Sequence, residues 1–227
     1  MVFFQLIDNR SGQIIRSKNL GGDQDDELRD VIQTNNGQFI LAGTTESDSK
    51  GKKDAWLVCI DEYGEIVWEE RYGTEGEDAF ETVVYDRQQN LITAFGYRND
   101  QKTEDIWGIQ VEPSASQANV LNDQLTYGRN EYDKVKAAVI NPSGKILLTG
   151  NHSRPKGHIF LLQVNEAGTQ EWARTYGRGE EIAEDLQLSQ AGYILVGSTI
   201  DRREGENMLA MAISPYGDQL WSEQFGS

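Results

Sequence analysis

The sequence repeats itself about four and a half times, with a period near 50 residues. An aromatic residue or leucine followed by glycine marks the copies, at Leu20-Gly21, Tyr72-Gly73, Tyr127-Gly128, Tyr176-Gly177 and Phe225-Gly226. A second glycine closes an apolar run in each complete copy, at Gly43, Gly96, Gly150 and Gly197. Repeats of this length are typical of propellers, solenoids and related arrays, in which each unit covers the apolar face of its neighbour.

Each complete copy predicts four short strands, which we call strands A to D. In the copy that spans residues 22–73, mixed or apolar runs cover residues 28–32, 39–43, 55–60 and 66–72. These runs are too short for helices and are bounded by glycine, asparagine or aspartate, which favours strands. Strands B and C are apolar without alternation, so both of their faces should be covered. The pattern predicts an all-β protein built as a β-propeller of four-stranded antiparallel blades. A β-solenoid is the alternative, although its coils are usually shorter.

The copies divide the chain into four complete blades and one half blade within a single domain, residues 1–227. The complete blades are expected at residues 22–73, 74–128, 129–177 and 178–226, and residues 2–21 hold only strands C and D. Three arrangements fit this count: a four-bladed ring with an added hairpin, a five-bladed ring with one reduced blade, and a fragment of a larger assembly. We favour the five-bladed ring. The unmatched hairpin also suggests a homo-oligomer or a larger assembly formed through it.

Glycine and tryptophan recur four residues apart, at Gly64/Trp68, Gly168/Trp172 and Gly217/Trp221. Together with Phe39-Ile-Leu-Ala-Gly43, Asp54-Ala-Trp-Leu57 and Tyr72-Gly73, these residues resemble a family of bacterial β-propeller repeats that is common in secreted and surface proteins. The Asp61 to Trp68 segment is also similar to the tryptophan-docking motif of quinoprotein-type propellers. This resemblance implies that Trp68, Trp172 and Trp221 wedge one blade against the next. Asp123 and Arg16 stand at the tryptophan position of the other two copies, which leaves two of the wedges in question.

Composition limits the classes of partner. The net charge of −16 disfavours nucleic acid and anionic membranes as partners. No stretch approaches the ~18 apolar residues of a membrane span, and the first residues do not read as a signal peptide. The compartment stays open: cytoplasmic for the chain as given, secreted or surface-bound for a fragment. Cys59 is the single cysteine and lies in an apolar run, so we expect it to be buried and without an internal disulfide.

Comparison of the copies separates the scaffold from candidate functional positions. Glycine and apolar positions recur, while most polar positions do not, which disfavours a lectin with one sugar site in every blade. The A–B and C–D turns read as short, and the B–C and D–A connections read as long and emerge on one face, where binding usually occurs. We therefore expect a non-catalytic scaffold that binds a protein or peptide through this long-loop face. The alternatives are a carbohydrate-binding propeller, a fragment of a larger surface or secreted propeller protein and, less favoured, a glycosidase-like enzyme.

Charges are sorted on the expected long-loop face, with basic residues in the B–C connections and acidic residues in the D–A connections. Because strand A is the innermost strand of a blade, this sorting predicts an acidic inner ring and a basic outer ring, although mixed charges are also ordinary on surfaces. The candidate binding residues are Lys50, Lys52, Lys53, Arg98, Lys102, His152, Arg154, Lys156, Arg202, Arg203, Asp26, Asp78 and Asp133.

The sequence offers little support for catalysis or metal binding. A propeller glycosidase needs carboxylates that converge, but Asp26, Asp78 and Asp133 occupy one repeat position, which favours a shared turn role. No nucleophile motif or phosphate loop is present. Asp23 and Asp25 could contact Ca²⁺ but lack the spacing of an EF-hand. We therefore expect that the chain is not an enzyme and uses no cofactor.

Overall fold

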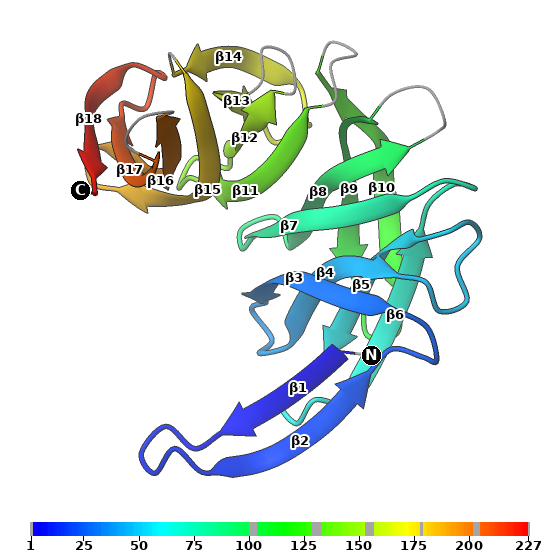
Figure 1. Ribbon diagram of the computed structural model, residues 1–227. Coiled ribbons are helices and arrows are strands. Elements are labelled where there is room, and N and C mark those ends of the chain that lie inside the picture. The colour runs from blue at the N-terminus through cyan, green and yellow to red at the C-terminus, as the bar shows by residue number, and fades with distance from the viewer. Residues whose placement is uncertain are drawn as a thin grey trace. The chain divides into compact units, whose positions relative to one another are not determined.

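The computed structural model describes residues 2–99, 104–128, 133–152, 157–177, 179–201 and 205–226 (Figure 1). Every regular element in these ranges is a β-strand, and the strands form one two-stranded and four four-stranded sheets. The described residues contain no helix that could cross a membrane. The prediction of an all-β protein with four-stranded antiparallel blades is confirmed.

Each four-stranded sheet contains four consecutive strands, and each falls within one of the repeat units expected from the sequence. A hairpin of β1 (Val2–Ile7) and β2 (Ile14–Leu20) precedes them. The first blade consists of β3 (Asp26–Gln33), β4 (Phe39–Thr45), β5 (Asp54–Ile60) and β6 (Ile66–Tyr72). The second consists of β7 (Asp78–Asp86), β8 (Leu91–Asn99), β9 (Glu104–Pro113) and β10 (Ala118–Tyr127). The third consists of β11 (Lys134–Ile140), β12 (Ile146–His152), β13 (His158–Val164) and β14 (Gln170–Tyr176). The fourth consists of β15 (Glu180–Ser189), β16 (Gly192–Asp201), β17 (Gly205–Ile213) and β18 (Gln219–Phe225).

The chain divides into two compact units, and each has an apolar core between neighbouring sheets. The first unit comprises Met1–Lys102 and Trp107–Gln124, and the second comprises Thr103–Ile106 and Leu125–Ser227. In the first unit, Leu57 and Trp68 of the first blade share a core with Phe80 of the second. All seven residues of β5 are buried, as the continuous apolar run of strand C predicts. Burial on both faces makes each blade dependent on its neighbour for stability.

A β-bulge explains the glycine that recurs in strand B. In all four blades the register between strands A and B shifts beside this glycine, for example between Val135 and Ala137 opposite Gly150. A Cβ atom at Gly150 would lie only 1.9 Å from the carbonyl oxygen of Lys134. The other three glycines meet a strand A carbonyl oxygen at 1.8 to 2.0 Å, so only glycine permits this close backbone approach. These are Gly43, Gly96 and Gly197.

The bulges also bring charged side chains of neighbouring blades together. The residue that interrupts the register is Arg29 in the first blade and Glu81 in the second, and their side chains form an ion pair. In the second unit, Lys136 and Glu184 occupy the same bulge positions, with 3.8 Å between Nζ and Oε2. Each unit therefore carries one pair of opposite charges at matched positions of adjacent strands A, which favours this pairing of blades over one that brings like charges together.

A side chain of one sheet packs on the C–D turn glycine of the next sheet at three junctions. In the second unit, a Cβ at Gly217 would lie 3.0 Å from ring atoms of Trp172, and the hydroxyl of Tyr176 donates to the Gly217 carbonyl. Leu125 contacts Gly168 in the same way, and in the first unit Phe4 contacts Gly64.

Trp68 is 4% exposed within the first core, whereas Trp221 is 44% exposed. Membership of the bacterial β-propeller repeat family and the tryptophan-docking role of Trp68, Trp172 and Trp221 stay predictions.

The bulge predicts that alanine is not tolerated at Gly150. Gly150→Ala should lower the free energy of unfolding by about 2 kcal/mol or more, because the added methyl group would displace a strand from the backbone beside it. Gly37→Ala is the matched control. Gly37 has a φ of +84°, with nothing within 4 Å of a built Cβ, so this change should cost only about 1 kcal/mol. Urea unfolding of both variants measures the difference, and equal losses would contradict the explanation.

Candidate functional site

The connections on the expected long-loop face are shorter than the sequence suggests. Only residues 46–53, which join β4 to β5, form a long connection in the described part of the chain. Strands B were expected to end where their apolar run ends, but β8 continues to Asn99 and β16 to Asp201. Ladder hydrogen bonds involve the backbone, so a strand can extend through polar residues beyond the buried layer. The prediction that the B–C and D–A connections are generally long is therefore wrong.

The B–C connection of one blade is hydrogen-bonded to the start of the next blade. The amide of Lys52 donates to the Gly76 carbonyl at 3.0 Å, and the amide of Asp78 donates to the Lys53 carbonyl at 2.9 Å. The equivalent bond in the second unit joins the Glu181 amide to the Gly157 carbonyl at 2.7 Å. These backbone bonds hold neighbouring connections together on one face of each unit.

Asp26, Asp78 and Asp133 each tie the start of strand A to the end of strand B in their own blade. Asp26 accepts hydrogen bonds from the Thr45 hydroxyl and from the Gly22 amide at 3.0 Å. Asp78 accepts one from the Asn99 amide at 3.0 Å.

In the third blade, Asp133 lies 2.8 Å from Nδ1 of His152. Asp133 is buried, and the side chain of His152 is 21% exposed. The shared repeat position thus has the shared structural role that the sequence indicates.

A pair of fully buried carboxylates, Asp54 and Asp78, lies where the first two blades meet. A Cβ atom at Gly73 would lie 2.7 Å from Oδ1 of Asp54 and 2.7 Å from Oδ2 of Asp78, so the two oxygens converge on one place. Oδ2 of Asp54 accepts a hydrogen bond from the Lys50 amide at 2.9 Å, whereas Oδ1 has no hydrogen-bond partner among the described residues.

Burial raises the pKa of the Asp78 carboxyl above its ordinary value. Hydrogen bonds from Thr74 and Asn99 and the positive charge of Arg98 oppose this effect. Asp54 belongs to the Asp54-Ala-Trp-Leu57 motif but was not expected to be a site residue. The available signal was its repeat position, which carries His158 in the third blade and Asn207 in the fourth.

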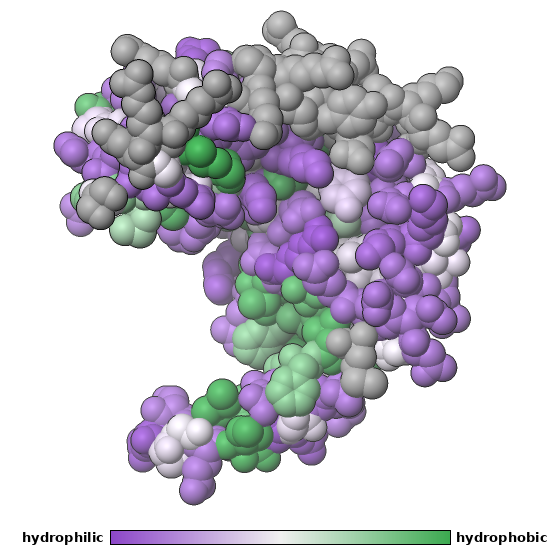
Figure 2. Space-filling view, in the orientation of Figure 1, coloured by the Kyte–Doolittle hydropathy of each residue, from purple (hydrophilic) through white to green (hydrophobic). Residues whose placement is uncertain are grey.

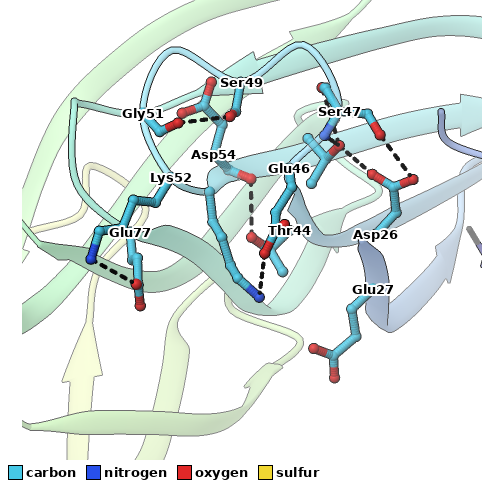
Figure 3. A network of polar contacts seen from close by, with 12 residues as sticks. Asp26, Glu27, Thr44, Glu46, Ser47, Ser49, Gly51, Lys52, Asp54 and Glu77 are labelled. Atoms are coloured by element: carbon cyan, nitrogen blue, oxygen red, sulfur yellow. Dashed lines mark hydrogen bonds and ion pairs between the residues drawn. The ribbon is translucent and has the colours of Figure 1, made fainter. Parts of the chain in front are cut away.

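Two of the basic candidates, Lys52 and Lys53, form ion pairs with nearby acids. Lys52 lies 3.4 Å from Glu77 of the following connection, and Lys53 lies 3.1 Å from Glu46 of its own connection (Figure 3). The guanidinium of Arg98 lies 4.2 Å from the ring centre of Trp107, and Lys50 is exposed. Lys52 and Lys53 therefore meet opposite charges locally, and the separation into an acidic inner ring and a basic outer ring stays a prediction. Lys102, Arg154, Lys156, Arg202 and Arg203 lie outside the described residues.

The described residues offer no metal site. Asp23 and Asp25 are exposed in the connection before β3, and no group of three or more His, Cys, Asp or Glu side chains in the described ranges could hold a metal ion. Cys59 is buried as predicted, and burial raises the pKa of its thiol to about 12, so it is a packed apolar side chain and not a nucleophile.

Solved structures share this fold at low sequence identity, although no protein-family model and no curated protein matches the sequence. A Bacteroides uniformis protein provisionally assigned as a 6-phosphogluconolactonase is 16% identical, with a TM-score of 0.60, over 98% of this chain and 64% of its own. An α-L-arabinofuranosidase from Clostridium thermocellum is 9% identical, with a TM-score of 0.54, over 88% of this chain and 72% of its own. An endo-1,4-β-xylanase from Bacteroides thetaiotaomicron is 14% identical, with a TM-score of 0.54, over 90% of this chain and 75% of its own.

The likeness shows the β-propeller fold, and this confirms the fold predicted from the repeat. The chain spans 64% of the length of the Bacteroides uniformis protein. The number of blades in a closed ring stays a prediction.

The prediction that the chain is not an enzyme is contradicted by these comparisons, because the similar structures are mainly glycosidases. The sequence argument relied on missing nucleophile motifs. Glycoside hydrolysis requires only two suitably placed carboxyl groups, which leave no local motif in a sequence. Missing motifs therefore do not exclude catalysis on this fold.

Burial of Asp78 predicts a specific pH dependence. Since the folded-state pKa of Asp78 lies above the ordinary 3.8, its contribution to stability is present at low pH and is lost as pH rises from about 3.8 through the raised pKa. Asp54→Asn should reduce this loss, because the new amide can donate to Asp78 while its oxygen still accepts from Lys50. We expect a gain of about 1 kcal/mol at pH 7.

Chemical denaturation between pH 4 and pH 8 measures this effect. Asp25→Asn is the matched control, because Asp25 is exposed in a neighbouring connection. The explanation fails if Asp54→Asn steepens the decline in stability with pH, or if Asp25→Asn flattens it equally.

Proposed function

We propose that this chain is an interaction propeller that takes up a β-strand from a protein partner along the open edge of β1. The proposal rests on a difference in hydrogen-bond pairing between β1 and the equivalent strand of each complete blade. Strand C lies between strands B and D in all four complete blades, but β1, which occupies the strand C position, pairs only with β2 among the described strands. A strand with one unpaired edge is a template for strand addition.

The hairpin is held on the first blade, so its edge is preorganised. Phe4 and Leu20 pack into an apolar cluster with Trp56 of the first blade. Oε1 of Glu65 lies 3.0 Å from the guanidinium of Arg16, and Lys18 also pairs with Glu65. Apolar packing and these contacts fix β1 against one sheet while its other edge stays open. A partner strand would thus avoid much of the entropic cost of ordering its template.

The partner expected from this edge is an apolar strand B, which in the first blade is β4 beside β5. A synthetic hairpin peptide with the sequence of residues 26–45 supplies this strand together with strand A. We expect the peptide to bind and to slow amide hydrogen exchange at those β1 amides that do not bond to β2. Mass spectrometry of β1 measures the protection.

A peptide of scrambled sequence is the control for this experiment. Gln5→Pro and Leu6→Pro form a matched pair, because neighbouring residues of a strand direct their amides to opposite edges. Only the variant that removes an amide from the open edge should lose peptide binding while keeping the hairpin folded. Equal protection by the scrambled peptide would refute strand addition.

Carbohydrate processing is the second candidate function, and the likeness to an arabinofuranosidase and a xylanase favours it. This function predicts release of nitrophenol from aryl α-L-arabinofuranosides or β-xylosides at least about tenfold faster than in buffer. Asp133→Asn should abolish the release if the partly accessible Asp133–His152 pair takes part, whereas Asp25→Asn should not. Release no faster than in buffer from both glycosides would remove this candidate.

A further inference from the structure

The junctions between sheets follow one rule, which defines two matched surfaces. One face of each sheet, called here the front, carries the position of Trp68 and Trp172. The opposite face, called the back, includes the C–D turn glycine that receives the front of the preceding sheet. In the second unit, the front of the third blade, with Trp172 and Ile159, packs on the back of the fourth blade, with Leu195 and Gly217. In the first unit, the front of the hairpin packs on the back of the first blade in the same way.

The fourth blade exposes large apolar side chains on its front. Met208 is 66% exposed, whereas Ile159 at the equivalent position of the third blade is fully buried. Phe225 of the fourth blade is 50% exposed, whereas Tyr176, at the equivalent position of the third blade, is 8% exposed. Trp221 is also exposed. No described sheet of its unit covers this apolar surface, which is of the kind that marks protein interaction sites.

The β1–β2 hairpin exposes its back. Phe3 is 62% exposed, whereas Trp56 at the equivalent position of the first blade is fully buried. Figure 2 shows hydrophobic residues gathered on this hairpin, at the lower end of the view. A Cβ built at the turn glycine, Gly12, would meet nothing within 4 Å, while the matching glycines of three blades each contact a side chain of the preceding sheet. Those glycines are Gly64, Gly168 and Gly217.

We infer that the front of the fourth blade binds the back of the β1–β2 hairpin of a second copy of this chain, with Trp221 on the Gly12 turn. The two surfaces match because both belong to one repeat, in which every covered front meets the back of a sheet of the same kind. Charge supports the match. In the third blade, Arg174 lies beside the turn glycine Gly217 of the fourth blade, and the exposed Glu223 occupies the equivalent position of the fourth blade. The hairpin turn that this glutamate would meet carries the exposed Arg10, so the charges are opposite.

The inferred contact is head to tail, since it joins two different surfaces of the chain. A heterologous contact leaves one free surface of each kind on a dimer, so assembly continues into a chain or closes into a ring of copies. The contact uses the faces of the sheets and not the edge of β1. The head-to-tail contact can therefore be tested independently of strand addition.

Light scattering across a range of concentrations tests the inference. The mean mass should rise with protein concentration, and Trp221→Ser should hold the protein at the mass of one chain. Tyr216→Ser is the matched control, because Tyr216 is an exposed aromatic residue of the same blade that lies in its C–D turn. A wild-type protein that stays monomeric up to about 100 µM, or a Trp221→Ser variant that assembles normally, would overturn the inference.

Cross-linking identifies which hairpin occupies the front. Asn9→Cys places a thiol in the hairpin turn, and Glu223→Cys places one beside Trp221, while the native Cys59 is buried. A mixture of the two single variants should form a cross-linked heterodimer under mild oxidation. A cross-link within the double variant and none in the mixture would show that the chain's own hairpin fills the site, which overturns the second copy as occupant. No cross-link in either sample would overturn the Trp221–Gly12 match itself.

Discussion

The structure depends on burial of both faces of the middle strands in each blade. β4 and β5 are apolar on both sides, so a blade in isolation would expose two apolar faces to water. Stability therefore comes from the junctions between blades, where the front of one sheet covers the back of the next. The same constraint gives the first and last sheets their importance. A sheet at either end of the series has one apolar face without a neighbour, and the repeat defines which kind of face would cover it.

Backbone geometry sets the register in which these faces meet. The bulge in strand A brings a carbonyl group so close to strand B that only glycine fits, and this occurs in all four blades. The interrupting residues are charged, and they pair at one junction in each unit, Arg29 with Glu81 and Lys136 with Glu184. One local distortion thus fixes the strand register and places complementary charges between neighbouring blades.

The aspartates that begin strand A illustrate how scaffold and function can share one residue type. Propeller glycosidases use carboxylates, and the fold of this chain is similar to two such enzymes. Asp26 and Asp78 nevertheless accept hydrogen bonds that close their own blades, and Asp78 is fully buried. Asp26 and Asp78 are therefore accounted for by the scaffold. Evidence for chemistry has to come from groups that differ between blades, such as the Asp133–His152 pair.

The sequence alone predicted the strands, the four complete blades, the half blade and the recurrent strand B glycine, because packing and turn geometry impose the same residue types on every copy. It predicted the connections poorly. The end of a strand depends on backbone hydrogen bonds to a neighbouring strand. The polar residues that extend β8 and β16 beyond their apolar runs do not indicate these bonds in the sequence. The pairing of Lys52 with Glu77 was also not predictable, because it joins loops from different blades.

Spacing and residue type determine which faces are apolar, and the sequence therefore decided that each sheet needs neighbours. Only the tertiary structure decided which faces remain uncovered. Trp68 and Trp221 occupy the same repeat position and read alike in the sequence, but one is buried at a junction and the other is exposed. The difference arises because a residue is buried only where a neighbouring sheet covers it, and the sequence of one repeat does not show whether such a neighbour is present.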